Sequence, residues 1–126
     1  MFEIFHDGVL IGRSELEGGD PPMGLAAGLF VPIDSFEVAR GFMTPVINGS
    51  GNAVDGFQRL DGLAARTADG TKITCLQVTV FELVADGLPL LEVHCDYIEA
   101  QQYAELFSHH RKAHDDHMRQ LTADTK

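Results

Sequence analysis

Apolar and polar residues alternate along the second half of the chain, as they do in strands of an antiparallel sheet with one solvated face. The alternation covers three stretches, near 58–68, 71–84 and 89–98. Asp69-Gly70 and Asp86-Gly87 separate these stretches. Asp-Gly suits the two-residue type I′ turn of a β-hairpin, because both residues adopt a left-handed backbone at low cost. The pattern therefore predicts a three-strand meander.

Two-residue turns would also fix how these strands pair. Paired positions would then sum to 139 across the first hairpin and to 173 across the second. This register places one apolar set on a single face of the sheet: Leu63, Ala65, Leu76, Val78, Val80, Leu91, Val93, Cys95 and Tyr97. Cys75 falls on the opposite face from Cys95, so we expect no disulfide between them.

The N-terminal residues predict a separate hairpin. Strands at 2–6 and 9–13 flank Asp7-Gly8, and a two-residue turn pairs Phe5 with Leu10 and Ile4 with Ile11. The sequence leaves open whether this hairpin joins the sheet of the meander. A further Asp-Gly pair, Asp61-Gly62, lies inside a predicted strand, where glycine indicates a bulge or bend.

The remaining segments predict short elements and a C-terminal helix. Clustered Gly and Pro predict a loop at 18–24, followed by a short strand at 28–33 and a short helix at about 35–42. Residues 99–121 read as helix, either continuous or broken at Ser108, with its first half packed on the sheet. We therefore predict one α+β domain over residues 1–126: an antiparallel sheet built from hairpins, with a C-terminal helix on one face.

Charge and composition narrow the classes of function. The chain carries 19 acidic and 9 basic side chains, a net charge of −10, which repels nucleic acid and favours basic protein partners. Residues 1–110 have a net charge of −11 (5 basic, 16 acidic), whereas 111–126 have +1 (4 basic, 3 acidic). No apolar run is long enough for a membrane helix. The first residues resemble no secretory signal, so a cytoplasmic location is expected.

Polar residues on the other face of the meander form the first candidate site. Glu92, His94 and Asp96 follow one strand at two-residue spacing, and the register places Thr79 and Gln77 across from His94 and Asp96. A carboxylate beside a histidine orients its ring, and a neighbouring hydroxyl completes the residue types of a nucleophile, a base and a carboxylate. The alternative is that these residues simply line a solvated sheet face.

Histidines form a second candidate at the C-terminus. His110 and His114 are four residues apart, so on a helix both rings can approach one zinc ion. His117 lies seven residues from His110, about 10.5 Å along a helix, which is too far for both residues to bind the same ion. The alternative is a solvated helix end, and we predict no dedicated metal or cofactor.

These observations favour a non-enzymatic protein-interaction domain, of the inhibitor, immunity or accessory kind. The expected partner is another protein or a second copy of the chain, because residues 21–30 form an uncharged apolar stretch that suits an interface of a homodimer. The alternative is a small enzyme or ligand-binding protein that uses the Glu92/His94/Asp96 face or the C-terminal histidines.

Overall fold

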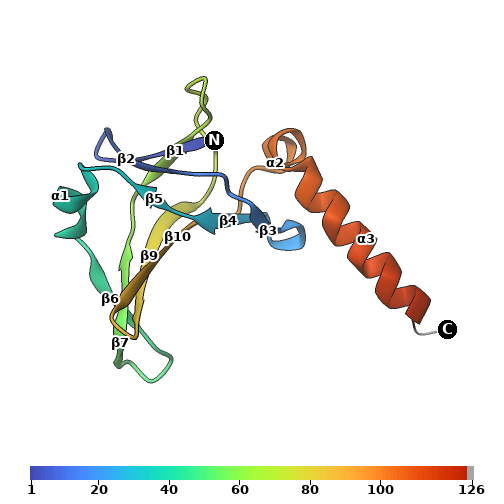
Figure 1. Cartoon of the computed structure of the whole chain (residues 1–126). Coiled ribbons are helices and arrows are strands. Elements are labelled where there is room, and N and C mark those ends of the chain that lie inside the picture. Colours follow the sequence, from blue (N-terminus) through green and yellow to red (C-terminus); the bar gives the residue numbers. More distant parts are fainter. Residues whose placement is uncertain (125–126) are drawn as a thin grey trace.

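Two antiparallel sheets and a C-terminal helical segment make up the fold (Figure 1). The computed structural model describes residues 1–124. The four-stranded sheet has the order β5-β2-β1-β8, and the six-stranded sheet has the order β3-β4-β10-β9-β7-β6. The strands are β1 Phe2–His6, β2 Val9–Ser14, β3 Gly18–Asp20, β4 Leu25–Leu29, β5 Val31–Pro32, β6 Thr44–Ile47, β7 Ala53–Leu60, β8 Ala64–Arg66, β9 Gln77–Ala85 and β10 Leu88–Asp96. The helices are the 3₁₀ turn η1 Pro21–Met23, α1 Phe36–Arg40, α2 Ala100–Leu106 and α3 Ser108–Asp124. The predicted α+β class is therefore confirmed.

The β9–β10 hairpin forms in the predicted register. Every pair from Leu88↔Ala85 to Asp96↔Gln77 sums to 173. Asp86 and Gly87 have φ angles of 54° and 77°, the left-handed conformations that a type I′ turn requires. Turn chemistry and apolar alternation agree here, so this register could be derived from the sequence alone.

The N-terminal hairpin also forms, with one change in pairing. Asp7 and Gly8 have φ angles of 49° and 79°, and Phe5 pairs with Leu10 as predicted. A bulge between Ile4 and Phe5 then shifts Ile4 opposite Gly12 instead of Ile11. This hairpin belongs to the four-stranded sheet, so it does not share a sheet with β9 and β10.

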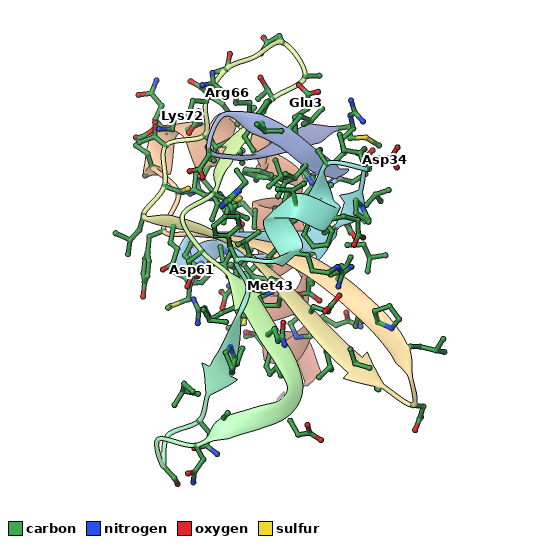
Figure 2. All side chains as sticks on the ribbon, turned by 90° about the vertical axis from the view of Figure 1, so that its left-hand side faces the viewer. Glu3, Asp34, Met43, Asp61, Arg66 and Lys72 are labelled. Carbon is green, nitrogen blue, oxygen red and sulfur yellow. The ribbon has the colours of Figure 1, made fainter. Side chains whose placement is uncertain are left out.

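The predicted register at Asp69-Gly70 is wrong by one residue. The Thr67 N–H donates to the Thr71 carbonyl (2.8 Å), so residues 68–70 form a three-residue loop and paired positions sum to 138. Side chains favour this loop, because the Thr71 N–H donates to Oγ1 of Thr67 and to Oδ1 of Asp69 (both 3.1 Å). Arg66 and Lys72 form the bridge beyond it and lie near each other in Figure 2.

The predicted strand at 58–68 is divided between the two sheets. Residues up to Leu60 belong to β7, which pairs with β9, whereas β8 pairs with β1 in the other sheet. Asp61-Gly62 lies between the two strands, and Gly62 has a φ of 72°, which a residue with a side chain rarely adopts. The bend that glycine indicated therefore carries the chain from one sheet to the other.

The core lies between the inner faces of the two sheets. It comprises Ile4, Ile11, Leu16, Ala26, Phe30, Phe36, Ala39, Leu60, Leu63, Ala65, Ile73, Val78, Val80, Val93, Cys95, Ile98, Tyr103 and Phe107. Most of the apolar set predicted for one face is buried here, and Leu91 packs against it. Leu76 and Tyr97 are exceptions, at 74% and 57% exposed. The β9–β10 pairing ends at Asp96↔Gln77, and Tyr97 has a φ of 54°, so the alternation of faces stops there.

Because the β9–β10 pairing ends at Gln77, Cys75 does not lie on the face that the predicted register gave it. Cys75 packs against the core that contains Cys95, so the prediction that the two lie on opposite faces is wrong. Both cysteines are free, as expected. The contact with Cys95 lowers the pKa of Cys75, whereas the contact with Cys75 and burial raise the pKa of Cys95. The two thiols are therefore chemically distinct.

The Gly- and Pro-rich segment contains more regular structure than predicted. Gly18–Asp20 forms the edge strand β3 instead of a loop, and the strand expected at 28–33 is replaced by β4 and β5, which lie in different sheets. Helix α1 falls inside the predicted range. Ala26 and Phe30 are buried within the uncharged stretch at 21–30, so part of that stretch belongs to the core.

The C-terminal helix is broken where Ser108 suggested. Helix α2 ends at Leu106 and α3 begins at Ser108, with Tyr103 and Phe107 buried against the body. Helix α3 then extends away from both sheets (Figure 1), and its residues 111–122 are mostly exposed. Within residues 1–124, no helix has the length and apolar character to cross a membrane.

Candidate functional site

The outward face of the six-stranded sheet brings the predicted site residues together. His94 lies opposite Thr79, and Asp96 lies opposite Gln77. Glu92 lies opposite Phe81, one step further along the same face. Directly opposite residues of an antiparallel pair project from the same side of the sheet. The pairing therefore places all five predicted residues on one face, as the register required.

His94 and Glu92 form a polar pair in this face. The Nε2 atom of His94 lies 2.6 Å from Oε1 of Glu92, and both side chains are partly exposed. A carboxylate only accepts hydrogen bonds, so Nε2 carries the proton. The imidazole packs edge-on against Phe81, with ring centroids 4.9 Å apart. The ring is thus fixed by a carboxylate on one side and by an aromatic ring on another.

Thr79 belongs to a different hydrogen-bonded group. Its hydroxyl is buried and donates to Oδ1 of Asp61 (2.9 Å). The Gln77 amide donates to the same Asp61 oxygen (2.7 Å) and to Oγ1 of Thr79 (2.9 Å). The Thr79 proton is therefore directed toward Asp61 and not toward His94. Asp61 was not among the predicted site residues, since it lies in the bend between the two sheets.

Asp61 is held as a carboxylate by its neighbours. Partial burial raises its pKa, but hydrogen bonds from Arg59, Thr79 and Gln77, together with the Arg59 charge, lower the pKa below its ordinary value. The Arg59 guanidinium reaches both carboxylate oxygens, at 2.9–3.1 Å. Arg59 also lies over the Phe81 ring, 5.2 Å from its centroid. This group fixes the bend and limits the charge that Arg59 presents to a ligand.

We expect Asp61→Asn to destabilise the fold at pH 7 by less than about 1 kcal/mol, because solvent screens this partly exposed pair. The folded-state pKa is lowered, so the stabilisation is present above the unfolded pKa near 3.8 and is lost as the pH falls through the folded value. Urea unfolding at pH 7 and pH 2.5 checks this. Asp34→Asn, which removes an exposed charge elsewhere, serves as the control. If the difference in unfolding free energy between wild type and Asp61→Asn is as large at pH 2.5 as at pH 7, the lowered pKa of Asp61 is contradicted.

An apolar hollow lies beside the His94–Glu92 pair. It has a volume of about 300 Å³ and is lined by Phe57, Phe81, Leu83, Leu90, Glu92 and His94. We call these six residues the open face. Phe57 and Phe81 have ring centroids 5.7 Å apart, and Leu83 and Leu90 are 40% and 49% exposed. Sequence reasoning missed these four apolar residues. The confirmed register already placed Leu83 opposite Leu90 and Phe81 opposite Glu92, so an apolar patch on the solvated face was the available signal.

A second hollow continues from the open face across β10. It has a volume of about 340 Å³ and shares Glu92 and His94 with the first hollow. Its other lining residues come from the connection between β2 and β3 and from β3 and β4: Glu17, Gly18, Gly19, Asp20, Leu25, Ala27, Gly28 and Leu29. We call Glu17, Asp20 and Glu92 the acidic edge. The two hollows are therefore adjacent, and we call them together the groove, which is apolar over β7 and β9 and acidic toward β3.

The predicted C-terminal histidine site is divided between core and surface. His110 is buried, its Nε2 donates to the Leu16 carbonyl (2.7 Å), and its ring stacks on Phe107 at 5.6 Å. One ring nitrogen of His110 is thus committed to holding α3 on the body. His114 lies one turn further along α3 and is half-buried. Over residues 1–124, no three His, Cys, Asp or Glu side chains are grouped to hold a metal ion.

The groove offers three kinds of contact to a binding partner. Its apolar end provides two aromatic rings and two leucines, its middle provides the His94–Glu92 pair, and its far end provides two further carboxylates. Such a surface suits binding of a mixed apolar and cationic group. No family model, curated protein or solved structure matches this chain.

Proposed function

We propose that the protein is a protein-interaction domain and that its partner docks on the open face. The observation that supports this is the apolar cluster on the outward side of the six-stranded sheet, formed by half-buried Phe57 and Phe81 and by exposed Leu83 and Leu90. Outward faces of antiparallel sheets are ordinarily polar. Contiguous exposed apolar surface, rimmed by polar groups, is typical of sites that bind another molecule.

The shape of the region adds to this argument. The β6–β7 and β9–β10 ribbons extend from the body and diverge toward their turns (Figure 2). The last pair between β7 and β9 is Phe57↔Leu83, at the open face itself. A partner that covers the open face would bury Leu83 and Leu90, at about 25 cal/mol for each Å² of apolar surface removed from water.

We expect Leu90→Asp to remove partner binding while the fold is kept, because Leu90 is half exposed and lies outside the core. The test uses wild-type, Leu90→Asp and Leu76→Asp proteins as baits in native lysate, followed by light scattering of each purified protein. Leu76 is an exposed leucine that does not line the hollow, which makes it the matched control.

The proposal is supported if a partner, either another protein or a second copy of the chain, binds to wild type and to Leu76→Asp. Its affinity for both should be at least about tenfold higher than its affinity for Leu90→Asp. A wild-type protein that is monomeric and recovers no partner would contradict the proposal. So would a partner that all three proteins bind equally.

A second candidate is the binding of a small apolar ligand in the same hollow. Its volume of about 300 Å³ is at the lower end of the range for ligand sites, and His94 with Glu92 would orient a polar group at one end. An NMR screen of small-molecule fragments, which follows the amide chemical shifts of the protein, tests this candidate. Saturable shifts centred on Phe81 and His94 would support it, and shifts elsewhere or none would exclude it.

A further inference from the structure

We propose that the segment of the partner that binds in the groove combines an apolar anchor with a Lys or Arg side chain. This inference rests on the proposed function and states the chemistry of the partner. The anchor lies in the apolar hollow against Leu83 and Leu90, and the cation reaches the acidic edge of Glu17, Asp20 and Glu92.

The charges around the groove favour a cation. The acidic edge places three carboxylates around one hollow, whereas the neighbouring cation, Arg59, is bonded to Asp61. The body over residues 1–110 carries a net charge of −11 (5 basic and 16 acidic side chains), so its field also steers a basic partner toward this surface.

Glu17 is held in place before any partner arrives. Its Oε1 atom accepts the Leu29 N–H at 2.8 Å. Its other oxygen lies over Gly28, where a β-carbon would be only 2.1 Å away. Glycine at position 28 therefore leaves room for this carboxylate at the sheet surface. A fixed carboxylate binds a cation with less loss of side-chain entropy than a mobile one does.

The strand spacing sets the separation between anchor and cation. The apolar hollow lies over β9 and the acidic edge extends over β4, and β10 lies between these two strands. Neighbouring strands are about 4.8 Å apart, so the two subsites are separated by about 10 Å, which an extended segment covers in about three residues. The partner segment is expected to carry Lys or Arg two to four residues from its apolar anchor.

A random peptide library displayed on phage tests this inference without knowledge of the natural partner. The wild-type protein is used for selection, and one selected sequence is synthesised and titrated by calorimetry against wild type, Leu90→Asp, Glu92→Gln, Glu17→Gln and Asp34→Asn. The expected sequences carry Lys or Arg two to four residues from Leu, Ile, Met, Phe or Trp. Leu90→Asp is expected to remove binding, and each glutamine variant to weaken it about threefold or more. Asp34→Asn is the control for loss of one exposed charge.

The outcomes separate this inference from the proposed function. Selected peptides that lose binding in Leu90→Asp, but show no enrichment of Lys or Arg and bind Glu92→Gln and Glu17→Gln as wild type, would overturn the inference and leave the docking surface intact. A selection that yields no binder, or only binders indifferent to Leu90→Asp, would overturn both. Circular dichroism of each variant confirms that it is folded.

Discussion

Replacing Phe107 with alanine is expected to lower the free energy of unfolding by about 3–5 kcal/mol, as for other large-to-small changes at fully buried aromatic residues. Phe107 is completely buried between α2 and α3. Its ring packs on Phe2 and Tyr103, each at 5.3 Å between centroids, and on His110. Alanine leaves a cavity that these rings cannot close, so contacts between β1 and the C-terminal helices are lost. Urea unfolding of both proteins measures the change.

The matched control for Phe107→Ala is Leu121→Ala on the same helical segment. Leu121 lies on the exposed part of α3, so we expect a change within about 0.5 kcal/mol. Amide hydrogen exchange adds a second readout: protection of α2 and the start of α3 should fall in Phe107→Ala more than protection of β9 and β10. A loss below about 1 kcal/mol for Phe107→Ala would show that the C-terminal segment contributes little to the stability of the body.

The hairpins show which parts of the fold local sequence determines. Asp86-Gly87 joins strands whose apolar alternation runs without interruption, so only one register satisfies both turn and core. At Asp69-Gly70 the two signals are weaker, because side chains of Thr67 and Asp69 bond the Thr71 N–H and stabilise a longer loop. Paired positions sum to 138 at this loop, whereas β7 pairs with β9 at positions that sum to 140, so neither part follows the predicted sum of 139.

The division between two sheets could not be predicted from local patterns. Leu60 and Ala65 are both buried and lie in what reads as one strand, yet they belong to different sheets. The sheet to which residues 64–66 belong is decided by their pairing with β1, which lies at the N-terminus. Gly62 indicated that the chain bends there, but a bend alone does not say which strand it meets next.

The candidate site was predictable to a similar extent. The confirmed hairpin register fixed Glu92 and His94 on one face and also fixed Phe81 and Leu83 beside them. The acidic edge was beyond sequence reasoning, because Glu17 and Asp20 reach Glu92 only through the pairing of β4 with both β10 and β3. Glu17 and Asp20 are 75 and 72 positions away from Glu92 in the chain.

Replacing Arg40 with methionine is expected to cost about 2–4 kcal/mol of unfolding free energy, because it leaves a buried carboxylate without its partner. Glu82 of β9 is buried at the inner face of the sheet, and the Arg40 guanidinium of α1 bonds its Oε2 atom. Arg40 also covers the Phe36 ring at 4.9 Å, a contact that the methionine side chain can partly keep. The loss therefore reports mainly on the unpaired charge, and urea unfolding at pH 7 measures it.

The double variant Arg40→Met/Glu82→Leu separates the ion pair from simple packing. When both charges are removed, no buried group is left unsatisfied, so we expect the double variant to be more stable than Arg40→Met alone by at least about 1 kcal/mol. Glu37→Gln is the control, since Glu37 is an exposed second neighbour of Arg40 at 3.6 Å and should contribute within about 0.5 kcal/mol. Equal stability of Arg40→Met and the double variant would show that Glu82 carries no penalty when unpaired. In that case α1 would be held on the body by burial of Phe36 and Ala39, and not by the charge pair.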